Sequence, residues 1–174
     1  MHHTFLFEPG IWTLDGTFWS ADGRSMAVVG KTEITHGPEC WLLAGRMRIL
    51  AAPPVDFVNV YRIEVPGRDQ RAYKWSSDDS TLGKLHGVFS VVGTAILSLY
   101  RSEQGGYQGS EHLRQMAAEE YEGFGVLLME DRRLSSWHVT LRRGARASAH
   151  HHEPTGAHHE SSGGHDESSG HHQT

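Results

Sequence analysis

The sequence of 174 residues is poor in the features that mark several common protein classes. It contains one cysteine, Cys40, so an internal disulfide framework is excluded. No apolar run approaches the ~20 residues of a membrane-spanning helix. The N-terminal segment MHHTFLFEPG lacks the basic region and the long apolar core of a signal peptide. These absences lead us to expect a cytoplasmic protein without a membrane span.

Basic clusters and nucleotide-binding motifs are also missing. The formal net charge is −5 with neutral histidines, and lysines and arginines form no basic footprint of a nucleic-acid-binding protein. The arginines between Arg132 and Arg146, near the end of the predicted domain, are better explained as solvated strand ends and a charged hinge than as a phosphate site. Phosphate-loop, dinucleotide and zincin patterns are absent. We therefore expect no nucleic-acid partner.

The segment from His150 to Thr174 contains no Lys, no Arg and no large apolar side chain. It cannot bury enough apolar surface to offset chain entropy, so residues 145–174 are predicted to form a disordered tail after a domain at 1–144. Neutral imidazoles bind divalent transition metals, and the carboxylates of the segment add oxygen ligands. We expect nickel or zinc binding; a solvated low-complexity tail with incidental affinity is the alternative. The candidate metal ligands are His150, His151, His152, His158, His159, His165, His171 and His172.

Residues 1–144 contain short apolar runs that alternate with polar residues and are separated by Gly, Asp and Ser. The segment Cys40–Leu50, for example, places large apolar side chains on one face and arginines on the other. A period of two residues is typical of a β-strand with one buried face. Asp22-Gly23 and Gly105-Gly106 lie between such runs and predict tight hairpin turns. The pattern predicts an all-β domain of about 8–10 strands.

The segment 107–118 fits both a strand and a helix. Glu111, Leu113 and Gln115 alternate as in a strand, whereas Leu113 and Met116 also fit a helical stripe. The hairpin signals that flank the segment favour a strand. Successive hairpins then predict a closed or nearly closed antiparallel up-and-down β-barrel, because closure removes exposed sheet edges. A barrel of this size can enclose one small ligand.

Two ends of the domain carry a pattern found in a known group of barrels. Gly10-Ile11-Trp12 places a Gly-x-Trp near the start of the first strand, and Arg142 and Arg143 end the last one. This pairing resembles the signature of the calycin group, which includes lipocalins, fatty-acid-binding proteins and smaller bacterial lipocalin-like families. The resemblance implies that Trp12 packs at the closed end of the barrel with a late arginine across its face. The lipocalin disulfide and secretion signal are absent, which favours a cytoplasmic lipocalin-like barrel.

The candidate ligand-binding residues share inward parity in the predicted strands. His36 has the same parity as Ile34, and the polar residues Asn59 and Tyr61 lie on an otherwise apolar face, where a buried amide and phenol need partners. Aromatic side chains with a few polar groups are typical of ligand cavities, and also of plain cores. The predicted site consists of His36, Trp41, Phe57, Asn59, Tyr61, Trp75 and Phe89.

Three functions remain open at this point. The main hypothesis is a protein that binds a small, largely apolar molecule in the barrel and divalent metal through the tail, as a metal-handling accessory protein. The first alternative is a lipocalin-fold isomerase, cyclase or hydrolase that uses an inward His36 with Tyr61 or Asn59. The second is a non-catalytic interaction protein with a filled barrel and a protein partner or homodimer. Adjacent Glu111 and His112 point to opposite faces of a strand, so they form no acid–base pair, and no catalytic residue is assigned.

Overall fold

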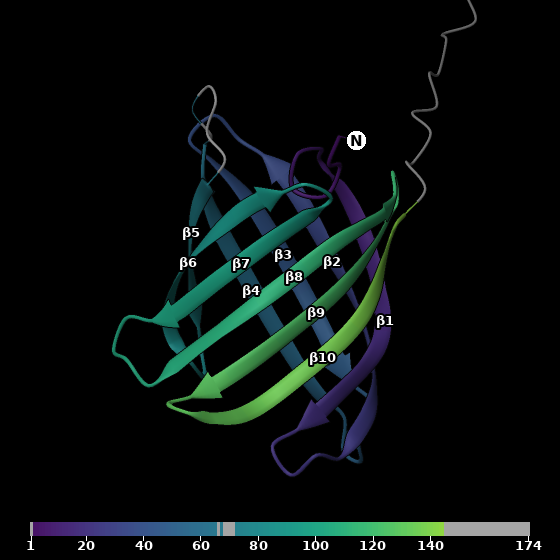
Figure 1. The fold of residues 1–174 in the computed structure, drawn as a ribbon, viewed down its shortest axis with the longest axis vertical. Helices are drawn as coiled ribbons and strands as arrows, with labels where there is room; N and C mark the ends of the chain where they lie inside the picture. The colour runs from purple at the N-terminus through teal and green to yellow at the C-terminus, as the bar shows by residue number, and fades with distance from the viewer. Residues whose placement is uncertain (1, 66, 68–71, 145–174) are drawn as a thin grey trace, which may run out of the picture.

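A computed structural model of the chain describes residues 2–65, 67 and 72–144. In these residues ten β-strands form one closed barrel, in which each strand pairs antiparallel with the next and β1 closes on β10 (Figure 1). The part of the chain that the structure describes has strands and turns but no helix, and therefore none that is long and apolar enough to span a membrane. The strands are β1 (Gly10–Ser20), β2 (Ser25–His36), β3 (Cys40–Ile49), β4 (Val55–Glu64), β5 (Ala72–Asp79), β6 (Gly83–Val92), β7 (Ala95–Ser102), β8 (Tyr107–Ala117), β9 (Glu120–Met129) and β10 (Arg132–Arg143).

The predicted all-β barrel is confirmed, at the upper end of the expected number of strands. The ambiguous segment 107–118 is almost entirely strand β8. Both predicted hairpins are present, and their glycines adopt the left-handed backbone that such turns require, with φ of +83° at Gly23, +78° at Gly105 and +91° at Gly106. The predicted tail at residues 145–174, with its candidate metal ligands, lies outside the described residues.

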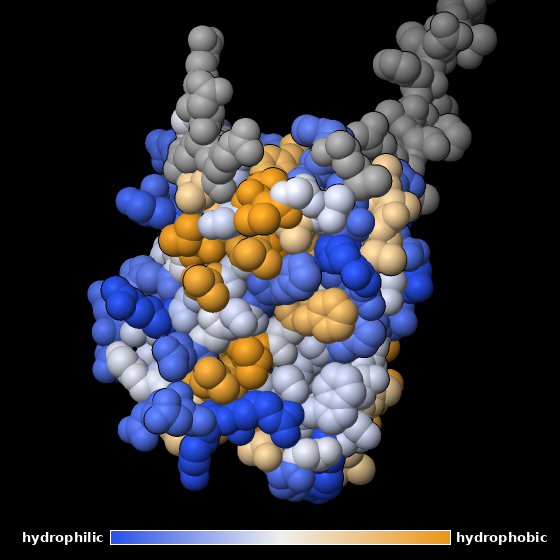
Figure 2. All heavy atoms as spheres, viewed as in Figure 1, coloured by the Kyte–Doolittle hydropathy of each residue, from blue (hydrophilic) through white to orange (hydrophobic). Residues whose placement is uncertain are grey.

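Alternation places the apolar side chains inside the barrel. Val28, Ile34, Ile63, Phe89 and Ile96 are each at most 1% exposed. The outer face carries charged residues and separate apolar ones, and Figure 2 shows apolar areas interrupted by polar atoms over β6 to β10. Because successive side chains of a strand point to opposite faces, the two-residue period of the sequence directly sets this division.

The N-terminal residues before β1 close one end of the barrel. Phe5 and Leu6 are buried under this end, and the phenol oxygen of Tyr121 accepts the backbone N–H groups of Thr4 at 3.0 Å and Phe5 at 3.3 Å. His3 Nε2–H donates to the carbonyl of Gly93 at 3.1 Å, so its Nδ1 is free to accept the Tyr121 hydroxyl at 3.2 Å. We call this end, with the strand segments around it, the closed half.

Trp12 lies at the centre of the closed half. Its side chain is fully buried and packs edge-on against Phe5, with centroids 5.3 Å apart, and against Tyr121 at 5.5 Å. The guanidinium carbon of Arg143 lies 5.8 Å from the indole centroid, and Arg143 is also paired with Glu8 at 2.5 Å. The tryptophan–arginine packing that the calycin resemblance implied is thus present with Arg143. Its neighbour Arg142 points outward and is paired with Asp15 at 2.8 Å.

Candidate functional site

The opposite half of the barrel contains a cavity of about 460 Å³. We call this part the hollow half. The cavity begins below Phe5 and extends to Tyr107 and Leu127 near the far hairpins. Its volume lies within the usual range for small-molecule sites, and its walls are mostly apolar. The apolar walls include Leu14, Phe18, Leu43, Met47, Leu85, Phe89, Leu113, Val139 and Leu141.

The wall of the hollow half has a seam between β4 and β5. These strands pair only at Arg62–Ser76 and Ile63–Trp75, next to the closed half. From Tyr61 back to Val55, β4 has no ladder partner on the β5 side among the described residues. Where two strands separate, their side chains have more space between them than in a continuous ladder. The cavity therefore adjoins a weak point in the barrel wall.

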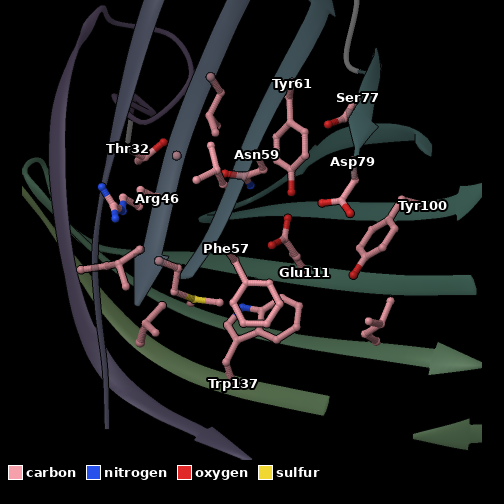
Figure 3. A pocket seen from close by; sticks show the side chains of 18 of the residues that line it. Thr32, Arg46, Phe57, Asn59, Tyr61, Ser77, Asp79, Tyr100, Glu111 and Trp137 are labelled. Atoms are coloured by element: carbon pink, nitrogen blue, oxygen red, sulfur yellow. The ribbon is translucent and has the colours of Figure 1, made fainter. Parts of the chain in front are cut away.

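Polar side chains gather inside the cavity beside this seam. Asn59 and Tyr61 come from β4 and Ser77 and Asp79 from β5, the two strands that separate there. Glu111 reaches the same space from β8 (Figure 3). Tyr100 of β7 completes the group, and Figure 3 shows Tyr61, Asp79, Tyr100 and Glu111 pointing toward one another. We call these six residues the polar cluster.

Glu111 is the most unusual member of the polar cluster. Its carboxyl group makes no hydrogen bond or ion pair with any described residue, although it lies inside the barrel. Burial raises the pKa of the Glu111 carboxyl from 4.5 to about 7, because a carboxylate loses its hydration there. The cavity keeps part of the side chain accessible to a water-sized molecule. At neutral pH this group is therefore divided between its charged and neutral forms.

The two tyrosines of the polar cluster are held in their neutral form. Burial raises the pKa of Tyr61 well above its usual 10, and the negative charge of Glu111 acts in the same direction. Burial and Glu111 together likewise raise the pKa of Tyr100. A hydrogen bond from the Asn59 side chain partly offsets the effect at Tyr61. Both phenols thus offer hydroxyl groups that donate or accept a hydrogen bond at any physiological pH.

Ser77 and Asp79 add further hydrogen-bonding capacity. Asp79 Oδ1 accepts the backbone N–H groups of Thr81 and Leu82, both at 2.7 Å, which fixes the carboxylate at the end of β5. The hydroxyl oxygen of Ser77 is buried without a hydrogen-bond partner in the described residues. Buried polar atoms are rarely left in this state, so each case calls for an explanation. Ser77 lines the cavity, where a bound molecule could supply the partner.

Glycines on neighbouring strands make space for large side chains of the hollow half. A Cβ atom on Gly109 would lie 2.3 Å from the phenol oxygen of its register partner Tyr100. A Cβ atom on Gly45 would lie 2.4 Å from Asn59 Oδ1. Gly125 has the same relation to Trp137. These close approaches fix the positions of Tyr100, Asn59 and Trp137, and no larger residue fits at the three glycines without displacing them.

The structure divides the seven predicted ligand-binding residues into three groups. Phe57, Asn59, Tyr61 and Phe89 all line the cavity. Trp75 stands behind the lining, 4.3 Å from the ring of Tyr61, and donates its indole N–H to Ser98. The remaining two belong to the closed half and are described next.

His36 and Trp41 lie away from the cavity. Their rings stack at 3.8 Å, and His36 Nε2–H donates to the carbonyl of Leu6 at 2.7 Å, so the imidazole helps to hold the N-terminal segment. His36 does not line the cavity that contains Tyr61 and Asn59. The structure therefore does not bring together the residues on which the enzyme alternative depends. Ligand binding by all seven residues remains a prediction.

Sequence reasoning overlooked Glu111, Asp79, Ser77 and Tyr100 as site residues. Glu111 entered the sequence analysis only as a possible acid–base partner of His112. The strand does point these two side chains to opposite faces. The available signal was that Glu111 shares parity with Leu113. An acidic residue at an inward position of a strand marks a candidate site, because an unpaired buried charge is unfavourable.

Residues 2–65, 67 and 72–144 contain no group of three or more His, Cys, Asp and Glu side chains that could hold a metal ion. The metal-binding prediction therefore depends on the sequence of the tail alone.

Comparisons with known proteins give little information on this chain. No family model matches it, and no curated protein matches it. Among solved structures, the chain is similar to a designed protein described as a "fluorescence-activating beta barrel", with 17% identity and a TM-score of 0.36, over 83% of this chain and 100% of that chain. A likeness at this TM-score carries no information about the ligand.

Proposed function

We propose that the protein binds a small amphipathic molecule in the cavity of the hollow half. The observation that carries the proposal is an apolar cavity of about 460 Å³ with one localised group of polar side chains. Such a cavity favours a ligand with an apolar body and a single polar end, since apolar walls select for buried area and a few polar groups fix the orientation. The unpartnered hydroxyl of Ser77 supports the same interpretation.

The seam between β4 and β5 gives this ligand a path to the cavity. Phe57 on β4 has inward parity yet is 42% exposed, because no β5 residue covers it. In the described residues, no ladder pair joins the segment from Val55 to Tyr61 to β5. The two strands can therefore move apart along this segment without breaking a ladder hydrogen bond. The packing of Trp12 under Arg143 supports the further proposal that the barrel is of the calycin kind.

A fluorescent probe tests the proposal. N-phenyl-1-naphthylamine is a neutral apolar dye that becomes bright in apolar cavities, and we expect it to bind the full-length protein. Leu113 lines the cavity, so Leu113→Trp fills part of the space and abolishes the fluorescence increase. Leu99 is 68% exposed on the outside of β7, so Leu99→Trp is the matched control and leaves binding unchanged.

Native mass spectrometry of the full-length protein then identifies the natural ligand. We expect a discrete added mass on the wild-type protein that is missing from Leu113→Trp. Equal probe binding by Leu113→Trp and wild type would place the apolar site outside the cavity and contradict the proposal. Thermal unfolding of each variant checks that the loss of binding does not come from loss of the fold.

We also propose that the histidine-rich tail binds nickel or zinc. The composition of residues 150–172 supports this, and the proposal is independent of the cavity. Titration of Zn²⁺ or Ni²⁺ into the protein should show affinity that weakens as the pH falls through ~6.5, where imidazoles become protonated. Serine substitution of the eight tail histidines should remove the affinity. Metal retention by that variant would contradict the proposal.

A further inference from the structure

We propose that the ligand of the hollow half is an amine, whose protonated nitrogen binds between Glu111 and Asp79 while its apolar body fills the cavity. This inference depends on the proposed ligand-binding function and specifies its chemical class. It follows from the negative charges that face the cavity and from the absence of a counter-charge for Glu111 among the described residues.

The polar cluster carries negative charge and no positive charge. Its two ionisable carboxyl groups, Glu111 and Asp79, come from opposite sides of the space and point toward each other (Figure 3). Among the described residues, the only basic ones at the cavity border are Lys31 and Arg46, exposed register partners on β2 and β3. Arg46 is paired with Asp56 at 2.9 Å, and Figure 3 shows its guanidinium pointing away from the cluster. Neither basic residue neutralises Glu111.

The carboxyl group of Glu111 is therefore without a counter-charge in the described residues. A buried carboxylate is stable when a cation pairs with it, and otherwise it takes up a proton. The raised pKa of Glu111, about 7, reflects the second situation. A cationic group at this place would favour the carboxylate, and the same interaction would give the ligand its affinity.

The surroundings of the two carboxyl groups suit an ammonium group in particular. An ammonium donates three hydrogen bonds, and Asp79 Oδ2 and the phenol oxygens of Tyr61 and Tyr100 can accept them. The hydroxyl of Ser77, a residue only 5% exposed, is a further acceptor and has no partner in the part of the chain that the structure describes. Phosphate or carboxylate ligands would instead meet like charge.

The proposal predicts an order of affinity among ligands that share one body. We use tryptamine, tryptophol and indole-3-propionate, which place an ammonium, a hydroxyl and a carboxylate at the end of the same indole side chain. Displacement of N-phenyl-1-naphthylamine reports their binding at about pH 8, where Glu111 is mostly ionised. We expect tryptamine to bind about ten-fold or more tighter than tryptophol, and indole-3-propionate to bind weakest.

Substitution of the carboxyl groups assigns the preference to this site. In Glu111→Gln the preference for tryptamine over tryptophol should fall to about two-fold or less, because the amide is neutral. Glu33→Gln, on the exposed face of β2, is the matched control. Asp79→Asn keeps the Oδ1 acceptor for the loop and should lower the preference partially. Asp78→Asn, at the neighbouring exposed position, should leave it unchanged.

The pH dependence gives a second readout. The titratable groups around Glu111 are Tyr61 on β4, Asp79 on β5, Tyr100 on β7 and Tyr107 on β8 itself, with Lys31 and Arg46 at the border. Burial raises the pKa of Glu111 to about 7, so the preference for tryptamine should increase from about pH 5.5 to about pH 8. Glu111→Gln should remove this increase.

The outcomes separate this inference from the proposed function. Equal affinity for the three compounds, a preference for indole-3-propionate, or a tryptamine preference that survives Glu111→Gln overturns the amine proposal while leaving apolar binding intact. Failure of tryptamine to displace the dye, in a protein that does bind the dye, overturns it as well. A protein that binds neither dye nor indoles contradicts the proposed function itself.

Discussion

The closed half and the hollow half of the barrel are built from the same strands with the same alternating pattern, but one has a packed interior and the other contains a cavity. In the closed half the N-terminal segment covers the strand ends, and Trp12 and Tyr121 are fully buried beneath it. In the hollow half two strands separate and leave a cavity, and Glu111 has no partner among the described residues. The comparison teaches that one half supplies the stability that lets the other hold an unfavourable group.

The largest expected difference comes from removing an indole from each half. Trp12→Ala leaves a large void among Phe5, Tyr121 and Arg143, so we expect a loss of about 3–5 kcal/mol in the free energy of unfolding. Trp137→Ala should lower it by less, because Trp137 is only half-buried and lines the cavity. Urea denaturation measures both losses, and the dependence of the unfolding free energy on urea concentration should have the same slope as in the wild type. Equal losses would contradict the division into two halves.

The next effect concerns the pH dependence of stability. The folded-state pKa of Glu111 is raised from 4.5 to about 7, so the folded protein binds this proton more tightly than the unfolded chain. Its contribution is fully present below about pH 4.5 and is lost as the pH rises through 7. The free energy of unfolding should fall by up to about 3 kcal/mol over this window through this group alone.

Glu111→Gln isolates this contribution from other titrating groups. Asp56 and Glu122, whose pKa values are lowered by arginine partners, change stability in the opposite direction in both proteins. The difference between wild type and variant should therefore grow from pH 5 to pH 7.5, in favour of the variant. A constant difference across this range would mean that Glu111 ionises normally in the folded protein.

The sequence predicted features that depend on local patterns. Alternation and the turns at Asp22-Gly23 and Gly105-Gly106 are local, and they were enough for an antiparallel barrel. Parity also assigned Phe57, Asn59 and Tyr61 to the inside. Parity gives the face of a strand, but it does not give the height along the barrel axis. His36 and Trp41 consequently share the parity of cavity residues and yet lie in the closed half.

The seam and the polar cluster depend on long-range geometry. That β4 and β5 separate at Tyr61 depends on the register and twist of the whole sheet, which no short segment encodes. Glu111 approaches Tyr61 and Asp79 across the barrel, from strands far apart in the sequence. Similarly, the apolar residues at Phe5 and Leu6 look like the opening of a strand, whereas they cover the barrel end.

A smaller effect tests how the N-terminal segment is held. Tyr121→Phe removes the acceptor for the N–H groups of Thr4 and Phe5 and the donor to His3. Buried donors without partners should lower the free energy of unfolding by about 2 kcal/mol. The same change should increase hydrogen exchange of these two amides. Tyr107→Phe is the control, since its hydroxyl has no hydrogen bond in the described residues, and it should change neither quantity.

The smallest expected effect is a truncation inside the hollow half. Leucine-to-alanine changes in cores usually lower stability by about 2–5 kcal/mol, because they remove contacts and leave a void. Leu113 borders an existing cavity and lacks contacts on that side, so Leu113→Ala should lower the free energy of unfolding by only about 1 kcal/mol. Ile34→Ala, at a site 1% exposed in the closed half, should lie within the usual range. The larger cavity of Leu113→Ala should also admit bulkier amines. If Leu113→Ala lowers the free energy of unfolding as much as Ile34→Ala does, the hollow half is packed as tightly as the closed half.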